Sequence, residues 1–329
     1  MIIGTHSGRF HCDEVLACVI LKSIPEFSSA NIERSRNHEL INKSDIVVDV
    51  GGIYDHATKR YDHHQGTFNL SAKDIDSSID SSIKLSSAGL IYLHYGKKSI
   101  ANVLSLDEKS DLIKLIHRKL YFKFIMEIDA IDNGINAADE MKYKISTDLS
   151  SRVGRLNPEW NIENADENEY FFKAFDLVDQ EYRSRLMHYK NVWLPAREIV
   201  EKSFSDRFNF HPEGKAFLLT KSCPWEDHIR DIEIELGLKD EQKPLYVVYE
   251  RNDKSWSIQG VHINENSFLV RFDPPKSWLG TRDEQLSKLA GVPDCVFCHS
   301  TGFLMINKTK DGIVKLLNEC LKNGKNNLS

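Results

Sequence analysis

The start of the chain alternates short apolar runs with polar loops. Residues 2–4 form a short apolar run, a polar loop with two histidines follows, and a second apolar run covers residues 15–24 before Pro25. The first run predicts a buried strand, and an apolar run of the second length that closes on a proline predicts a helix. The chain is therefore expected to begin with a strand, a polar loop and a helix.

A second buried strand is predicted over residues 45–52, where a β-branched run closes on Gly51 and Gly52. Such a run is typical of a central parallel strand, and it places Asp49 at the carboxyl end. Ligands of open α/β sheets bind at that edge. The next predicted elements are a hairpin over 54–61, a loop over 71–87 and a helix over 88–95.

Long helices are predicted in the middle of the chain. Asp107 suits an N-cap, and the apolar residues after it recur at helical spacing until the pattern stops at Asn133. Residues 167–207 are also mostly helical in pattern, and Pro195 predicts a break or a kink between two helical pieces. We interpret this second stretch as a connector between domains.

Strand and helix patterns alternate after residue 208. Strands are predicted over 216–220, 245–250, 255–263 and 296–306, and helices over 225–236 and 311–321. This alternation predicts a second, smaller α/β or α+β domain. The predicted division is a domain over 1–165, a helical connector over 166–207 and a C-terminal domain over 208–329.

Composition and charge narrow the class of protein. Of the 329 residues, 41% are hydrophobic and 28% are charged, which is the balance of a globular protein. The formal net charge is −6, and no segment is a polybasic footprint for nucleic acid. If the ligand is anionic, its attraction must come from local charges such as bound cations, because the global field is weakly repulsive.

The chain shows no membrane or leader pattern. No run approaches the roughly 18 uncharged apolar residues that a membrane helix needs, and no leader pattern precedes the first strand. The six cysteines are spread through a chain too long for a disulfide scaffold, so we expect reduced thiols. These features predict an intracellular protein, cytoplasmic or nuclear, with no mitochondrial leader and no membrane partner.

Histidines concentrate near the N-terminus. Six of the thirteen lie in the first 64 residues, where even spacing predicts about two or three. They form clusters with carboxylates: His6, His11 and Asp13; Asp49; and Asp62, His63 and His64. Imidazole and carboxylate together suit Mn²⁺, Fe²⁺, Co²⁺ or Zn²⁺, and several carboxylates around two cations suit a two-metal hydrolase with ions about 3.5–4 Å apart. The clusters therefore predict a metal centre.

A further carboxylate pair, Asp129 and Asp132, has the spacing i, i+3 that places both on one helix face. Such a pair alone is more often a solvated helix end. Because three other clusters precede it, we interpret the pair as completing the metal shell. Cys12 lies between His11 and Asp13, and we expect it to turn away from the site if its neighbours point inward.

The segment of Cys295, Cys298 and His299 has the spacing of covalent haem attachment, and its two thiols match half of a zinc site. We reject both readings. Haem attachment of this kind normally occurs in an oxidising export compartment, and no second Cys-x-x-Cys completes a zinc site. A strand with buried thiols and no haem is predicted instead.

The order of these motifs resembles that of the DHH superfamily of phosphoesterases. The match is closer still to the melanocyte-proliferating-gene exonuclease family, and it runs essentially from end to end. The segments that carry this resemblance are 4–14 (GTHSGRFHCDE), 129–134 (DAIDNG), 155–158 (RLNP) and 302–303 (GF).

The resemblance implies a DHH-type catalytic domain with a parallel sheet and a second domain that closes over the substrate. It implies metal-dependent removal of nucleotides from RNA 3′ ends, with two divalent ions, Mn²⁺ or Mg²⁺. One ion would be held by His6, His11 and Asp49, and the other by Asp13, Asp49, His63 and Asp132. Asp129 would be an extra metal ligand, or it would contact a ligand without binding the metal itself. Asp62 would orient His63, and His64 would contact phosphate.

The C-terminal domain of such proteins presents a substrate loop, which the resemblance places at His299, Ser300 and Gly302, with Arg282 as a further phosphate contact. The family commonly has two glycines after the Gly-Phe of this motif. Here the residues that follow Phe303 are Leu304, Met305 and Ile306.

Two alternatives stay open. The same metal centre would serve a small-nucleotide or oligoribonucleotide phosphatase or a pyrophosphatase. Outside enzymes, a metal-stabilised binding protein would keep the same fold. The assembly is left open between a monomer and a homodimer.

Overall fold

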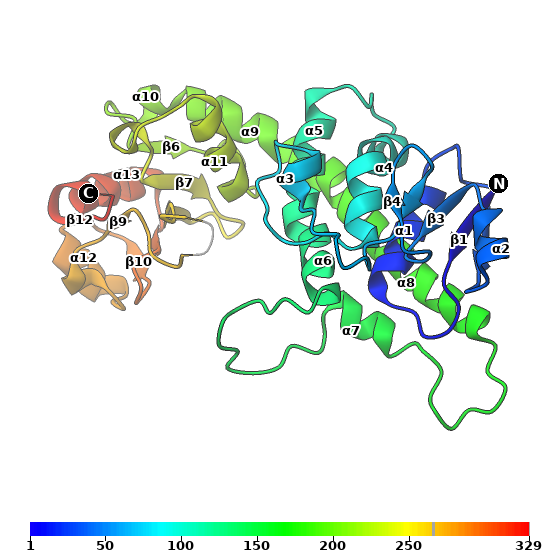
Figure 1. Cartoon of the computed structure of the whole chain (residues 1–329). Helices are drawn as coiled ribbons and strands as arrows, with labels where there is room; N and C mark the ends of the chain where they lie inside the picture. Colours follow the sequence, from blue (N-terminus) through cyan, green and yellow to red (C-terminus); the bar gives the residue numbers. More distant parts are fainter. Residues whose placement is uncertain (265–266, 329) are drawn as a thin grey trace. The chain divides into compact units, whose positions relative to one another are not determined.

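Two compact units make up the chain, Met1–Tyr189 and Lys190–Ser329. The computed structural model describes residues 1–264 and 267–328 (Figure 1). The boundary between the units falls inside the predicted connector over 166–207. The helices of that stretch therefore belong partly to the first unit and partly to the second. A separate connector between two domains stays a prediction.

The first unit is built on a five-stranded sheet in the order β2-β1-β3-β5-β4. Its strands are β1 (Ile2–Thr5), β2 (Asn31–Arg34), β3 (Ile46–Val48), β4 (Tyr54–Asp55) and β5 (Arg60–Tyr61). All neighbours are parallel except β4 and β5, which form the predicted hairpin. Sequence analysis missed β2, because this edge strand exposes alternate residues and lacks an apolar run.

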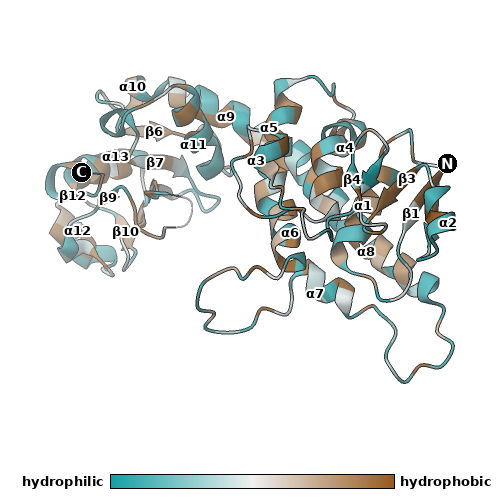
Figure 2. Cartoon of the chain, viewed as in Figure 1, coloured by the Kyte–Doolittle hydropathy of each residue, from teal (hydrophilic) through white to brown (hydrophobic). Residues whose placement is uncertain are grey.

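Helices cover this sheet. They are α1 (Cys12–Lys22), α2 (His38–Asn42), α3 (Ala72–Ile75), α4 (Ser87–Leu104), α5 (Asp111–Leu120), α6 (Met126–Asp132), α7 (Leu149–Gly154) and α8 (Glu167–His188). Helix α1 is buried from Cys12 to Leu21 and packs against α4 and α8 (Figure 1). Figure 2 shows hydrophobic residues in β1 and β3, next to this helix. A helix that is apolar on all sides belongs in the interior.

Two of the helix predictions need correction. The helix predicted over 88–95 runs on to Leu104, where Ser105 adopts a left-handed conformation. The next helix begins after Ser110, whose hydroxyl accepts a hydrogen bond from the Ile113 amide, and not at Asp107. A π-helical turn, Tyr121–Ile125, then joins α5 to α6. Such turns are frequent at functional sites, and α6 stops at the predicted place before Asn133.

The second unit has a five-stranded sheet in the order β10-β11-β8-β7-β6. Only β6 and β7 are parallel neighbours. Its strands are β6 (Ala216–Leu218), β7 (Tyr246–Glu250), β8 (Trp256–Gly260), β10 (Cys295–Cys298) and β11 (Leu304–Asn307), with β9 (Phe272–Asp273) and β12 (Lys325–Asn326) as a separate pair. The run predicted as one strand over 296–306 is thus a hairpin.

The helices of the second unit are α9 (Leu194–Ser205), α10 (Arg207–Phe210), α11 (Glu226–Glu235), α12 (Asp283–Ala290) and α13 (Lys310–Asn323). Short 3₁₀ turns lie at Asp240–Gln242 and Lys276–Trp278. The predicted break at Pro195 is present as a π-helical turn, Tyr189–Trp193, that precedes α9. Across the described residues, no helix has both the length and the apolar character needed to cross a membrane.

Candidate metal centre

Asp49 lies at the centre of the site, immediately after β3. Its backbone has φ of 58°, a left-handed conformation that residues other than glycine rarely adopt. The Asp49 amide donates to the carbonyl of Tyr61 at 3.0 Å, and its carboxylate is buried. Strained backbone of this kind collects at functional sites, where the surrounding structure maintains it. The turn thereby aims the carboxylate at the residues that follow β1.

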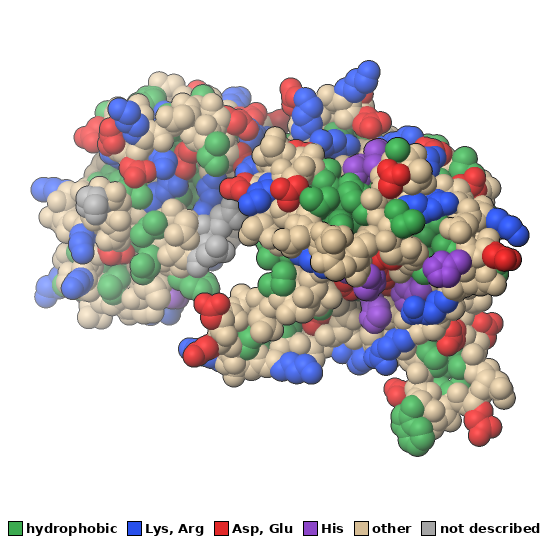
Figure 3. Space-filling view, viewed as in Figure 1, with side chains coloured by type: hydrophobic (Ala, Val, Ile, Leu, Met, Phe, Trp, Pro, Cys, Tyr) green, Lys and Arg blue, Asp and Glu red, His purple; other side chains and the backbone are tan. Residues whose placement is uncertain are grey.

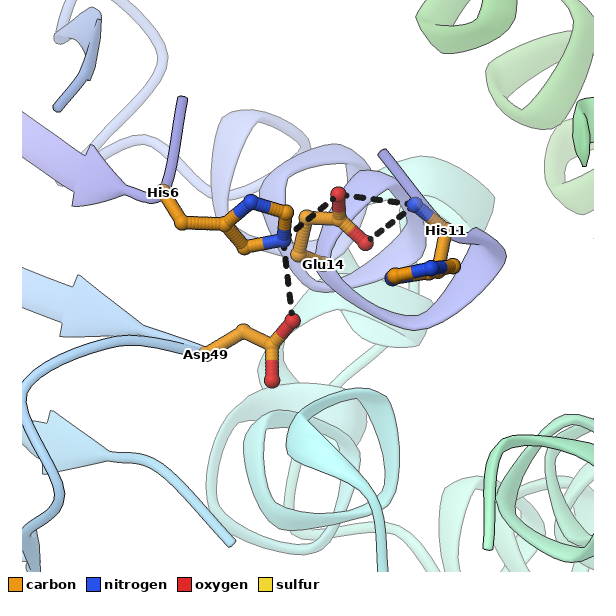
Figure 4. A group of neighbouring side chains, drawn as sticks. All are labelled: His6, His11, Glu14 and Asp49. Atoms are coloured by element: carbon orange, nitrogen blue, oxygen red, sulfur yellow. Dashed lines mark hydrogen bonds and ion pairs between the residues drawn. The ribbon is translucent and has the colours of Figure 1, made fainter. Parts of the chain in front are cut away.

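A first group of possible ligands joins Asp49 to His6, His11 and Glu14 (Figure 4). The His6 Nε2 atom lies 3.1 Å from a Glu14 oxygen and 3.3 Å from an Asp49 oxygen. Glu14 also accepts the His11 amide, with both oxygens at 2.9 Å. Sequence analysis missed Glu14, because its place in the first turn of a helix is that of a capping residue.

A second group contains Asp13, His63 and Asp132, and a third joins Asp49 to His63 and His64. The His63 Nε2 atom is 3.1 Å from Asp132, 3.4 Å from Asp49 and 3.9 Å from Asp13. Both oxygens of Asp13 and the Nδ1 atom of His63 are buried without a hydrogen-bond partner among the described residues. Buried polar atoms in this state usually have a bound partner such as an ion or water. The group could hold a metal ion.

The pairing of Asp62 differs from the predicted one. Asp62 does not orient His63. Its Oδ1 atom lies 2.8 Å from Nδ1 of His64, and the backbone amides of Gly52 and His64 also donate to this carboxylate. Burial alone would raise the pKa of Asp62, but the hydrogen bonds from His64 and Gly52 bring this pKa below its ordinary value. Asp62 in turn raises the pKa of His64. Asp62 therefore holds the partly exposed His64 ring beside Asp49, whose carboxylate lies 3.5 Å from Nδ1 of His64.

Asp129 lies apart from the ligand groups, although it is one helical turn from Asp132. It is fully buried, and its carboxylate accepts hydrogen bonds from the amide and hydroxyl of Ser86, the amide of Gly89 and the hydroxyl of Tyr121. A Cβ atom at Gly89 would collide with this carboxylate. Burial raises the pKa of Asp129 to about 7. These contacts tie α4 to α6, which positions Asp132.

The chemistry of the donor set fits divalent cations. His6 Nδ1 lies 3.2 Å from the carbonyl of Ser7, which can accept a hydrogen bond from Nδ1–H and leave Nε2 as the ligand atom. Burial raises the pKa of Asp13 well above its ordinary value, and the nearby Asp49 and Asp132 raise it further. Buried carboxylates that repel one another are stabilised when a cation lies between them.

Cys12 takes no part in these groups. It is buried as the first residue of α1, and burial raises the pKa of its thiol. Because Cys12 begins a helix, the alternation of side chains expected for an extended segment does not describe where its side chain points.

Two cavities flank the ligand groups. The first, of about 540 Å³, is lined by Arg9, His11, Cys12, Asp13, Asp49, His63, His64, Lys84, Ile128, Ile131, Asp132, Asn133, Ser150, Ser151 and Gly154. The second, of about 520 Å³, is lined by His6, His11, Arg36, Asp49, Val50, Gly51, Gly52, Asp62, His64 and Gln65. His11, Asp49 and His64 border both cavities. Volumes of this size suit small molecules or single nucleotides.

The remaining candidates lie in the second unit. His299 Nδ1 lies 2.9 Å from the Thr301 hydroxyl, and the amide of Gly302 donates to the carbonyl of His299. The Arg282 guanidinium lies 5.0 Å from the centre of the Phe297 ring. These contacts bring Arg282 to the strand that leads into the loop of His299, Ser300 and Gly302.

The two thiols of the Cys-x-x-Cys segment, Cys295 and Cys298, are buried and free in β10. Burial raises the pKa of Cys298 to about 12. Both side chains pack in the core of the second unit.

Comparison with known proteins gives matches over most of the chain. The sequence model of the MYG1 exonuclease family, described as "Uncharacterised protein family (UPF0160)", matches residues 2–321. The MYG1 exonuclease of Homo sapiens is 42% identical over 317 residues, which are 95% of this chain and 84% of that protein. The MYG1 protein of Caenorhabditis elegans is 40% identical over 329 residues, which are 99% of this chain and 96% of that protein.

Asp129→Asn and Asp132→Asn form a matched pair of variants on one helix. We expect Asp132→Asn to lose bound metal, because its carboxylate faces His63. Asp129→Asn should retain metal, because its oxygen still accepts the Ser86 and Gly89 donors. Elemental analysis after dialysis against Mn²⁺ measures the metal content of both variants. Metal loss in Asp129→Asn alone would reverse this assignment.

Metal uptake is expected to release protons. Burial alone would lower the pKa of both His6 and His63. Asp49 and Glu14 nevertheless raise the pKa of His6 to about 10. Asp132 and Asp49 raise the pKa of His63 to about 9. A ligand imidazole must be neutral, so Mn²⁺ affinity should rise with pH between about 6 and 9. Titration calorimetry in two buffers of different ionisation enthalpy counts the released protons. An affinity independent of pH over this range would contradict the expectation.

Proposed function

The chain belongs to the MYG1 exonuclease family, and on that premise we propose that it is a divalent-metal-dependent phosphodiesterase that shortens single-stranded RNA from the 3′ end. The observation that carries the proposal is that the buried Asp49 belongs to two possible ligand groups, one with His6 and one with His63. A carboxylate shared in this way is the usual arrangement for two metal ions that act on one phosphate. Placement in the DHH superfamily is part of the proposal.

The chain's own residues would carry out distinct tasks. His6, His11, Glu14 and Asp49 would hold one divalent ion, and Asp13, Asp49, His63 and Asp132 the other. When bound, such ions acidify water and neutralise charge on phosphoryl oxygens. Hydrolysis adds water across the P–O3′ bond. The shortened strand leaves with a 3′-hydroxyl that takes up a proton, and the phosphate stays on the released nucleotide.

His64 would contact the phosphate that reacts. Its side chain is 64% exposed, borders both cavities and is held by Asp62 through Nδ1. Nδ1 donates to Asp62, so Nε2 can donate to an anion when the imidazole is protonated, and Asp62 favours that form by raising the pKa of His64. A fixed donor aimed at developing charge stabilises the transition state more than the substrate.

Hydrolysis of small substrates, such as short oligoribonucleotides or pyrophosphate, remains the second candidate function. The cavities have the size of a single-nucleotide site, and that observation also suits a phosphatase for short oligoribonucleotides. The length of the cleaved chain separates the two functions. The substrate loop of Arg282, His299, Ser300 and Gly302 stays a candidate for RNA contact.

Incubation of the protein with Mn²⁺ and 5′-labelled single-stranded RNA tests the proposal. We expect a ladder that shortens from the 3′ end, and no ladder with Asp49→Asn, which should keep the far-ultraviolet circular dichroism of the wild type. Dinucleotides and pyrophosphate are tested in parallel. Turnover of the small substrates alone would support the second candidate, and an active Asp49→Asn would overturn the two-metal assignment.

His64→Ala should retain the metals and lose rate. Removal of one fixed donor typically lowers kcat by about 10²–10³-fold. Metal content and steady-state kinetics are measured on His64→Ala and on His63→Ala, which should instead lose metal and regain part of its rate in excess Mn²⁺. If His64→Ala is the metal-depleted variant, the roles of the two histidines are exchanged.

A further inference from the structure

Two basic side chains, Arg9 and Lys84, line the larger cavity together with Asp13 and Asp132. Arg9 is exposed and Lys84 is half-buried. Neither forms an ion pair within the part of the chain that the structure describes, whereas Lys59, Lys97 and Lys98 in the same unit are all paired. Figure 3 shows histidine side chains gathered on one face of this unit, with basic side chains beside them.

The backbone on both sides of Arg9 is held in place. The Gly8 amide donates to a Glu167 oxygen at 2.9 Å. On the other side, Phe10 exchanges two hydrogen bonds of 2.9 Å with the side chain of Asn157. The loop is therefore fixed by contacts that leave the Arg9 side chain unused. An unpaired guanidinium that lines a cavity from a fixed loop is well suited to phosphate.

Lys84 is also held in place beside the ligand groups. Its carbonyl accepts a hydrogen bond from the side chain of Asn133, next to Asp132. Its ammonium lies 5.8 Å from the centre of the Phe68 ring, and that ring lies against His63. The ammonium group is thus placed near the metal centre by a buried aromatic ring.

Resting on the proposed function, we propose that Arg9 and Lys84 bind the phosphate that precedes the reacting one in the RNA strand. The reacting phosphate lies at the shared ligand Asp49 and at His64. A strand that continues into the first cavity carries its next phosphate toward the two basic side chains. Because the net charge of the chain is −6, this contact supplies local attraction that the whole protein does not.

The proposal distinguishes substrates by their number of phosphates. A dinucleoside monophosphate has only the reacting phosphate and cannot use Arg9 and Lys84. A trinucleotide with a free 5′-hydroxyl has one phosphate more and can. The double variant Arg9→Ala, Lys84→Ala is therefore compared with the wild type on both substrates. The control is Lys43→Ala, Lys109→Ala, which removes the same charge from exposed sites of the same unit outside both cavities.

For the double variant, kcat/KM on the trinucleotide should fall by about tenfold or more, mainly through KM, as expected for the loss of charge-assisted bonds to one phosphate. On the dinucleoside monophosphate, kcat/KM of the double variant should stay within about twofold of the value for the control variant. Its metal content should equal that of the wild type. Binding of a fluorescent trinucleotide in Ca²⁺ gives a readout apart from turnover. Its salt dependence should become less steep by about 0.7, which corresponds to one phosphate contact on a single strand.

Other outcomes overturn the proposal. An equal loss on both substrates would mean that Arg9 and Lys84 act on the reacting phosphate or on the metals. A loss matched by the control variant would mean a general effect of charge. If the wild type cleaves neither substrate, the proposed function fails, and the binding measurement still decides whether these two residues hold the additional phosphate.

Discussion

The concentration of buried carboxylates at the end of β3 is the constraint on which the rest of the first unit depends. Asp13, Glu14 and Asp49 are almost completely buried, and Asp132 lies beside them. Like charges at this distance in a poorly solvated site destabilise a fold unless protons or cations lie between them. Burial raises the pKa of Asp13, and repulsion from Asp49 and Asp132 raises it further. Function and stability are therefore coupled through the same groups.

Contacts outside the ligand groups keep these carboxylates in place. Asn157 and Glu167 hold the loop after β1 at Phe10 and Gly8, and Asp129 joins α4 to α6. These residues come from parts of the chain that are far apart in sequence. These contacts give a structural role to the motifs at residues 129–134 and 155–158, although most of their side chains lie outside the possible ligand groups. Their role is to set the distances between ligands, on which catalysis by a metal centre depends.

The pattern of apolar runs was sufficient to predict the β1–α1 start, the central strand β3 and the carboxylate that follows it, because burial imposes a strong signal on sequence. The partners of individual side chains were not predictable in this way. Glu14 has the sequence position of a helix cap, and only the fold brings it to His6. Asp62 is adjacent to His63 in sequence, but the turn directs it to His64 instead. Asp129 and Asp132 share a helix face, yet the packing of α4 against α6 buries only the first as a structural residue.

The left-handed turn at Asp49 connects the geometry of the ligands to the shape of the site. A residue other than glycine in this conformation costs on the order of 1–2 kcal/mol, and the bond from its amide to Tyr61 helps to maintain it. Because the chain reverses at this point, Gly51 and Gly52, both with positive φ, line the second cavity, where a side chain would meet no neighbour within 4 Å. The Gly52 amide then reaches back to Asp62, which holds His64. One turn of backbone thus positions the Asp49 carboxylate, borders one cavity and, through Gly52 and Asp62, holds His64.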